Sequence, residues 1–406
     1  MIRNNIISIS GEPVTGKSSN IQTIKQKLIE NGYKEENIHI ISAGHQFRDY
    51  FNSVLNFILN INDDKKIQEL SKDNCIQTII KNPKYKSDLI KIIANLKSSN
   101  ALEHISIEQA NNMPELQDLR FLIDTIIDTR IYDLGQNLNQ KDYTDEFWIV
   151  DSRLAFKNIP HSFSVRLTCR PDIAGKRLFN DKSRGKEDND YKNIEDAIAQ
   201  REKRKNGEIS RYLQRYNIDL TDENNYNLII DTSFSNINDI SNTILTCFDR
   251  YKNNQTVAKK WTSPKQMLPL QRDITTCRPS FKNYSIDDMR ASITKNGYDQ
   301  NYPIEVVEYN NKKYIIEGHH RNFAAAYEGN TLVPYEVLSK DDDPSTENYY
   351  GGCSPKRIAQ SLSKDYLYGH EFFLDKITNG GRFSYKQIYP DIFDEIDKNS
   401  QEIELD

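Results

Sequence analysis

Short apolar runs and helical stripes alternate in the first part of the chain. Residues 5–10 form an Ile-rich, β-branched run that favours a buried strand. The apolar positions of 17–31 recur at helical spacing, and Gly32 stands where a helix would end. Residues 38–42 form another short apolar run. Strand, loop, helix and strand in this order predict the start of a parallel α/β sheet.

A long helical pattern follows before the strand patterns return. Apolar stripes at helical spacing predict a helical insertion over residues 49–140. Further elements are predicted as strands at 147–150, 164–169 and 227–231, and as a closing helix at 237–248. The stretch 180–190 contains no apolar residue. We therefore expect an exposed, lid-like loop at 180–193.

The pattern changes again after residue 250. Residues 251–266 are polar and aperiodic, which predicts a linker. A smaller α+β unit is predicted at 267–345, and a helical extension at 346–406. The expected elements of the smaller unit are a helix at 285–296, strands at 304–308, 313–316 and 333–338, a hairpin turn at 309–312 and a short helix at 322–327. Residues 1–250 are expected to form the larger α/β domain, around a parallel five-stranded sheet.

Charge and composition narrow the classes of function. The 406 residues carry 54 Lys and Arg against 59 Asp and Glu, a net charge of −5, which excludes a uniformly basic nucleic-acid coat. No apolar run approaches the roughly 18 residues of a membrane helix, and the N-terminus lacks the apolar core of a signal peptide. The five cysteines form no C-x-x-C pair. We therefore expect reduced thiols in a cytoplasmic protein that does not bind a membrane.

The strongest chemical signal lies between the first predicted strand and helix. Residues 11–18 read G-E-P-V-T-G-K-S and match the P-loop pattern G-x-x-x-x-G-K-[ST]. The glycines let backbone N–H groups turn inward around a phosphate, Lys17 supplies a cation for the β- and γ-phosphates, and Ser18 supplies a hydroxyl for Mg²⁺. The start of the following helix adds further attraction for anions. The predicted ATP-binding residues are Gly11, Thr15, Gly16, Lys17, Ser18 and Ser19.

Ordered segments give residues 1–250 a resemblance to nucleoside monophosphate kinases of the cytidylate kinase type. Residues 42–48 (S-A-G-H-Q-F-R) resemble the family's S-x-G-x-x-F-R segment, and 149–155 (I-V-D-S-R-L-A) resembles its (E/D)-G-R-L-A strand end. Residues 211–219 with 226–233 resemble its R-Y-x-x-x-Y-G-I-D…Y-D-L-V-I-D-T-S ending. The resemblance implies a P-loop kinase that uses ATP and Mg²⁺ to phosphorylate a nucleoside monophosphate.

The resemblance and the chemistry of phosphoryl transfer together imply the site residues. Two anionic ligands must be brought into line, so several cations should converge where parallel strands end. Lys17, Arg153 and the loop residue Arg184 are expected to be catalytic. Ser18 and, through water, Asp151 are expected to hold Mg²⁺. The expected acceptor-binding residues are Ser42, Arg48, Asp128, Arg130, Arg153, Arg204 and Arg211.

The sequence departs from the kinase pattern near the expected acceptor site. His45 stands where the family often has an acidic residue, and Ser152 stands where it often has glycine. The insertion at 49–140 is much longer than a simple cytidylate kinase needs. The acceptor therefore stays open between CMP, dCMP, a modified nucleotide and another small molecule.

A second resemblance, to the ParB/sulfiredoxin superfamily, covers residues from about 268 to 340. Its signature is the G-H-H-R segment at 318–321, within I-I-E-G-H-H-R-N-F-A-A-A. In that superfamily the corresponding turn and helix start receive nucleotide phosphates, which implies a second nucleotide site at Gly318, His319, His320 and Arg321. His319 replaces the catalytic cysteine of sulfiredoxin, which argues against sulfinic acid repair. A metal site at the His pair and an inert docking module are the alternatives.

These observations predict an ATP-dependent, (d)CMP-type nucleoside monophosphate kinase fused to a ParB-like nucleotide-binding domain. One alternative is a P-loop kinase of a non-nucleotide small molecule, with the ParB-like part as a second kinase. The other is a nucleotide-gated switch that binds DNA or protein. The net charge of −5 and the lack of a dense basic stripe count against nucleic acid as the partner.

Overall fold

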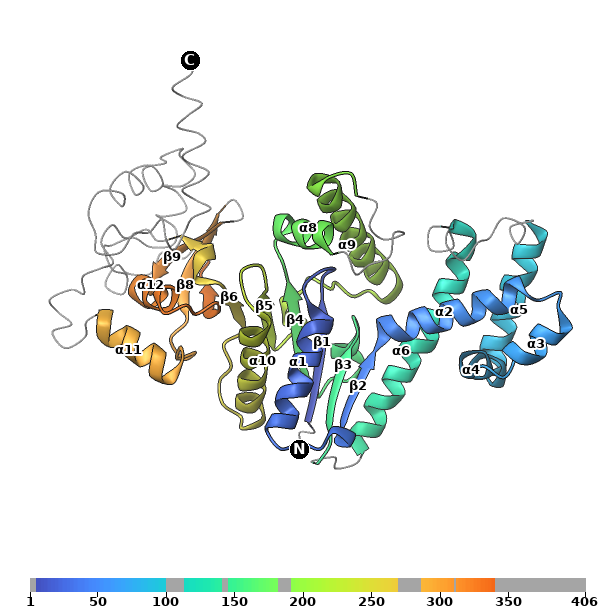
Figure 1. Cartoon of the computed structure of the whole chain (residues 1–406), viewed down its shortest axis with the longest axis horizontal. Helices are drawn as coiled ribbons and strands as arrows, with labels where there is room; N and C mark the ends of the chain where they lie inside the picture. The colour runs from blue at the N-terminus through green and yellow to red at the C-terminus, as the bar shows by residue number, and fades with distance from the viewer. Residues whose placement is uncertain are drawn as a thin grey trace, which may run out of the picture. The chain divides into compact units, whose positions relative to one another are not determined.

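A computed structural model describes residues 5–99, 113–140, 145–181, 191–268, 286–309 and 312–339 (Figure 1). The fold is α/β, with parallel pairing predominant among its strands. The chain divides into two compact units. Unit 1 comprises Met1–Pro13, Lys25–Val165 and Gly175–Tyr226, and unit 2 comprises Val14–Ile24, Arg166–Ala174 and Asn227–Asp406.

Three parallel strands form the sheet of unit 1, in the order β2-β3-β1. They are β1 (Asn5–Gly11), β2 (Ile38–Ser42) and β3 (Phe147–Asp151). Every residue of β1 is buried, as expected for a parallel strand covered on both faces. The strands predicted at 5–10, 38–42 and 147–150 are thus confirmed.

Helices make up most of the described residues of the range 49–140. Its elements are α2 (Ala43–Leu59), α3 (Asp64–Leu70), α4 (Asn74–Lys81), α5 (Pro83–Ser98), η4 (Pro114–Leu116) and α6 (Gln117–Gln140). Figure 1 shows α3, α4 and α5 gathered around the end of α2 that lies away from β2. Apolar side chains of α2, α4, α5 and α6 share one core with Ile6 of β1 and Val150 of β3. This core fixes α2 and α6 relative to the sheet.

The remaining elements belong to unit 1 alone or contribute to both units. Unit 1 also holds η1 (Glu35–Asn37), α7 (Ala155–Asn158), α9 (Ile194–Tyr216) and η6 (Glu223–Asn225). Both units share α1 (Lys17–Glu30), β4 (Phe163–Thr168) and α8 (Pro171–Asn180). Gly135 permits a close approach of α6 to α7, because an added Cβ would lie 2.3 Å from Asn158 O.

Unit 2 contains a mixed sheet in the order β5-β6-β10-β8-β9-β7. Its strands are β5 (Leu228–Asp231), β6 (Lys260–Thr262), β7 (Met267–Leu268), β8 (Ile304–Tyr309), β9 (Lys312–Glu317) and β10 (Val333–Val337). Its helices are α10 (Ile237–Lys252), η7 (Pro264–Gln266), α11 (Ile286–Asn296) and α12 (His319–Tyr327). β8 and β9 are antiparallel, as the predicted hairpin requires. The predicted helices and strands lie at these places, although α12 begins three residues early.

The segment 251–266 differs from the expected linker. It contains β6, which pairs in parallel with β5 and antiparallel with β10. Trp261 is 7% exposed and Thr262 is fully buried. A strand of three residues is too short to show the alternation of apolar and polar positions that identifies a strand. Because the flanking residues are polar, the sequence pattern did not predict β6. Residues 251–266 therefore join their neighbours into one sheet instead of separating them.

Several expectations fall on residues outside the described ranges. These are Arg184, most of the loop at 180–193, the tip of the hairpin turn at 309–312 and the extension at 346–406. Within the described ranges, Cys75, Cys169 and Cys247 are free thiols. In the same part of the chain, no helix combines the length and apolar character needed to cross a membrane.

Candidate functional site

The carboxyl ends of the unit 1 strands meet at one edge of the sheet. Ser42 ends β2 opposite Asp151 of β3, and Ile9 of β1 also lies opposite Asp151. The hydroxyl of Ser42 donates a hydrogen bond to Asp151 Oδ2 at 2.9 Å and also caps α2 by accepting one from His45 N. Asp151 is 5% exposed. A buried carboxylate therefore stands at the sheet edge where β1 runs into residues 11–18.

Residues 11–18 connect a strand directly to a helix, which is the context that the P-loop motif requires. β1 ends at Gly11 and α1 begins at Lys17. Between them Val14 has a φ of +66° and Gly16 a φ of +76°. A left-handed conformation is costly for a β-branched residue such as Val14, so this turn is strained. Asn20 Nδ2 donates to Gly16 O at 2.9 Å and ties the turn to the first part of α1.

Arg153 is held by an acidic partner close to the end of β1. Its Nε and Nη2 donate to Glu208 Oε2 of α9 at 3.0 and 2.8 Å, and its Nη1 donates to Gly11 O. Burial lowers the pKa of the Arg153 guanidinium, but Glu208 outweighs burial and the net pKa is raised. Burial likewise raises the pKa of Glu208, and Arg153 and Arg204 bring it below its usual value. Both groups are therefore charged at neutral pH.

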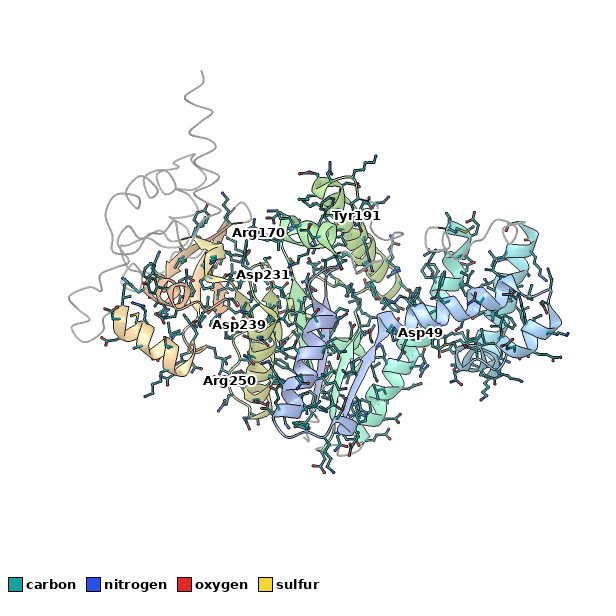
Figure 2. The ribbon with its side chains drawn as sticks, in the orientation of Figure 1. Asp49, Arg170, Tyr191, Asp231, Asp239 and Arg250 are labelled. Atoms are coloured by element: carbon teal, nitrogen blue, oxygen red, sulfur yellow. The ribbon has the colours of Figure 1, made fainter. Side chains whose placement is uncertain are left out.

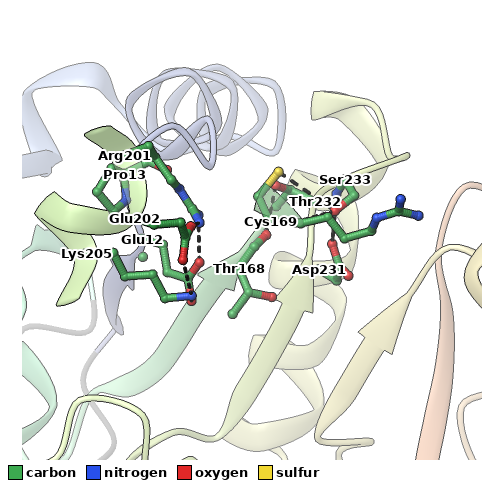
Figure 3. A network of polar contacts seen from close by, with 12 residues as sticks. Glu12, Pro13, Thr168, Cys169, Arg201, Glu202, Lys205, Asp231, Thr232 and Ser233 are labelled. Atoms are coloured by element: carbon green, nitrogen blue, oxygen red, sulfur yellow. Dashed lines mark hydrogen bonds and ion pairs between the residues drawn. The ribbon is translucent and has the colours of Figure 1, made fainter. Parts of the chain in front are cut away.

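A second ion-pair network links Glu12 to α9 (Figure 3). Glu12 Oε2 lies 2.7 Å from Arg201 Nη2, and Glu12 Oε1 lies 3.0 Å from Lys205 Nζ. Arg201 Nη1 also pairs with Glu202, and its Nε donates to Pro13 O at 3.4 Å. The side chain of Arg201 is 0% exposed. Burial of a guanidinium is tolerated because each of its nitrogens has a polar partner.

Arg48 differs from these arginines because it is exposed. It lies on α2, and an added Cβ at Gly44 would lie 4.0 Å from Arg48 Nη1, so the guanidinium lies over the first turn of that helix. Within the described residues it has no hydrogen bond or ion pair. One turn away, His45 Nε2 lies 3.7 Å from Asp49 Oδ2; Asp49 is labelled in Figure 2. Arg48 and the N-terminus of α2 therefore present positive charge together.

The facing sides of α6 and α9 hold a cluster of aspartates, arginines and tyrosines. Asp124 Oδ2 lies 4.0 Å from Arg211 Nη1 and 3.6 Å from Arg215 Nη1. Tyr216 donates its hydroxyl hydrogen to Asp128 Oδ2. Burial raises the pKa of Asp124 to about 6 and also raises that of Asp128. Both carboxyl groups therefore hold their protons to a higher pH than an exposed aspartate does.

The structure separates Arg130 from Asp128, although sequence reasoning grouped them. Two positions apart on one helix, the side chains point to different faces. Arg130 Nη1 donates to the hydroxyl of Tyr50 on α2, at 2.5 Å. The side chain of Arg204 is 62% exposed, and its Nε lies 3.5 Å from Glu208 Oε1. Sequence reasoning missed Glu12 and Glu208 as partners of arginine side chains, because the charged run at 201–208 resembles an ordinary solvated helix face.

The second expected nucleotide site lies at the start of α12. Gly318 has a φ of +98°, and an added Cβ would meet Ile304 Cδ1 at 2.9 Å, so glycine is required here. Arg321 Nη2 donates to Pro303 O at 3.2 Å, and its Nη1 lies 3.6 Å from Glu317 Oε1. Burial lowers the pKa of His319 to about 3, so this imidazole is neutral at physiological pH. An anion at this site must compete with Glu317 for Arg321.

The D-T-S segment at 231–233 forms a turn at the end of β5 in unit 2, also drawn in Figure 3. Asp231 Oδ1 accepts from Ser233 N at 2.9 Å. Ser233 Oγ in turn accepts from Arg170 N at 2.9 Å. These bonds join the residues that follow β4 and β5, so the role visible for the segment is structural.

Comparisons with known proteins identify no family for this chain. No family model and no curated protein matches it. Among solved structures, it is similar to the crystal structure of an uncharacterized protein from Eubacterium ventriosum ATCC 27560. The identity is 11%, the TM-score is 0.32, and the match covers 60% of this chain and 98% of the other. A TM-score this low carries no argument about fold or function.

Proposed function

We propose that this chain is an ATP-dependent phosphotransferase, and most specifically a (d)CMP-type nucleoside monophosphate kinase. The observation that carries the proposal is the segment 11–18. It combines the G-x-x-x-x-G-K-S sequence with a strand before it, a helix after it and left-handed backbone at Val14 and Gly16. A strained turn at a helix start is the geometry that backbone N–H groups need to surround a phosphate.

The residues of the loop 11–18 and of the adjacent sheet edge are proposed to bind the phosphoryl donor, ATP. The ammonium of Lys17 binds the β- and γ-phosphates of ATP, together with the N–H groups of the loop. The hydroxyl of Ser18 and the carboxylate of Asp151 are hard oxygen donors that suit Mg²⁺. When bound, Mg²⁺ would neutralise phosphate charge. Ser42 supports this role because its hydrogen bond orients the Asp151 carboxylate.

Arginine side chains beside β2 and β3 are proposed to bind the phosphoryl acceptor. Arg48 is available to hold the acceptor's phosphate because it is exposed at the first turn of α2. Arg153 is kept in a fixed position by Glu208 and Gly11 O. Asp128 and Arg211 are proposed to border the rest of the acceptor. The chain's contribution to transfer is then alignment and charge neutralisation, with no covalent intermediate.

Two further parts of the proposal concern the acceptor and the ParB-like part. The helical insertion keeps a non-nucleotide acceptor as an alternative, because it adds α3, α4 and α5 beside the helix that carries Arg48. Gly318, His319, His320 and Arg321 are proposed to bind a second nucleotide or to dock a partner.

The test is a panel of nucleoside monophosphates and small alcohols assayed for ADP release by the full chain. We expect the highest turnover with CMP or dCMP. Lys17→Ala should abolish turnover, because the ammonium is proposed to bind the β- and γ-phosphates of ATP. Arg48→Ala should raise the acceptor KM or lower kcat while ATP affinity changes by less than about tenfold. Turnover by Lys17→Ala close to that of the wild type would contradict the proposal.

A further inference from the structure

Glu12 places a negative charge inside the loop proposed to receive phosphates. It follows Gly11 directly and lies five positions before Lys17. Its side chain is 11% exposed, so water screens the charge weakly. An unpaired carboxylate here would repel every phosphate that the loop is proposed to bind. The loop therefore needs positive charge beside Glu12 to neutralise its carboxylate.

One face of α9 supplies these cations. Arg201 and Lys205 are four residues apart and so lie on the same face of the helix. They approach the two different oxygens of Glu12, at 2.7 and 3.0 Å. Glu202 and Glu12 carry two negative charges, and Arg201 and Lys205 carry two positive charges, so these four charges sum to zero (Figure 3).

We propose that Arg201 and Lys205 are positioning residues that neutralise Glu12 and hold it away from the bound triphosphate. This inference rests on the proposed function, because it assumes that the loop binds ATP. The two cations do not themselves touch the phosphates. Their effect on ATP binding runs through Glu12, and removing the Glu12 charge should make them dispensable.

The experiment is a double-mutant cycle on the full chain, with MgATP affinity measured by titration calorimetry. Arg201→Met should weaken affinity at least about tenfold at low salt, since it uncovers a charge in a poorly screened site. Glu12→Gln combined with Arg201→Met should restore affinity to within about threefold of the wild type. Lys203→Met removes the same charge from the exposed face of α9 and should change affinity by less than about twofold.

Lys205→Met provides a second route if Arg201→Met fails to fold, because Lys205 is partly exposed. It should weaken affinity less than Arg201→Met, and Glu12→Gln should again restore it. Unchanged affinity in both single variants, or a double variant as weak as the single one, overturns the inference alone. A wild-type chain that binds no MgATP overturns the proposed function and this inference together.

Discussion

At the scale of single residues, burial decides what each charged group can do. Arg48 and Arg201 have the same side chain, but one is exposed and the other is fully buried between Glu12, Glu202 and Pro13 O. The exposed arginine is available to a ligand, whereas the buried one is committed to internal partners. Sequence spacing alone does not distinguish these two situations.

Asp124 allows the effect of burial on the pKa and on stability to be tested at a single position. Its pKa is raised from 3.8 to about 6, first of all by burial. The folded state then holds the proton more tightly than the unfolded state, so stability falls as pH rises from about 4 to 6 and the penalty persists above that. A pKa difference of this size corresponds to roughly 3 kcal/mol as an upper limit.

We therefore expect Asp124→Asn to stabilise the chain by about 1–3 kcal/mol at pH 7 and to give little gain near pH 3.8. Urea unfolding at a series of pH values measures this difference. Asp133→Asn, on an exposed part of the same helix, is the control. A gain that does not change between pH 4 and 7 would show that the ion pairs with Arg211 and Arg215 cancel the effect of burial on the pKa of Asp124.

At the scale of elements, the start of α12 shows how a terminus acquires its properties. The apolar pattern predicted a helix from Asn322, but α12 begins at His319 because Gly318 adopts the left-handed conformation that ends the preceding strand. Glu305 lies opposite both Glu317 and Glu336 on the neighbouring strands. Burial, followed by these two carboxylates, raises the pKa of Glu305. The N-terminus of α12, which favours anions, therefore lies next to strands that carry acidic side chains.

The affinity for a nucleotide at the start of α12 should depend on both members of the ion pair between Arg321 and Glu317. In the full chain carrying Lys17→Ala, Arg321→Ala should weaken ATP or CTP binding at least about tenfold, the scale of a charge-assisted hydrogen bond. Glu317→Gln should tighten binding up to about fivefold, because an exposed ion pair contributes up to about 1 kcal/mol. Titration calorimetry measures both, with Glu308→Gln as the control on the same sheet. No binding by the Lys17→Ala chain would leave the docking module as the better account.

At the scale of the whole molecule, residues 251–266 decide how the C-terminal half folds. β6 lies between β5 and β10, and α10 contacts the residues that follow α11 and α12. Thr331 Oγ1 donates to Asp239 Oδ2, and Arg250 Nη2 donates to Asn301 Oδ1 at 2.8 Å; Asp239 and Arg250 are labelled on α10 in Figure 2. The residues that follow α11 and α12 are therefore packed against α10 within unit 2.

Trp261→Ala should destabilise the chain by about 3 kcal/mol, since the indole is buried in β6 and its Nε1 donates to Ala258 O at 2.9 Å. The free energy of unfolding in urea gives the measurement, and Lys260→Ala in the same strand is the control. A loss below about 1 kcal/mol would restore the interpretation of 251–266 as a linker. A chain ending near Tyr251 should also unfold more easily, because it leaves β5 without its neighbour β6.

The sequence by itself determined the features that depend on local order along the chain. Strand runs, helical stripes and the G-x-x-x-x-G-K-S segment are local, so the elements around residues 5–42 and 286–337 were predicted within a few residues. The positions of Ser42, Asp151 and Gly11 at one sheet edge also followed, because parallel strands bring their carboxyl ends together.

Only the tertiary structure decided which charges face each other and which are buried. Arg201 and Glu208 lie on α9, and nothing in a charged helix face predicts that Arg201 meets Glu12 in a loop almost 190 residues earlier. The strand β6 likewise exists because β5 and β10 provide partners on both sides. Local pattern fixes what an element is, whereas burial, ion pairing and sheet partners depend on contacts that form only when the chain folds.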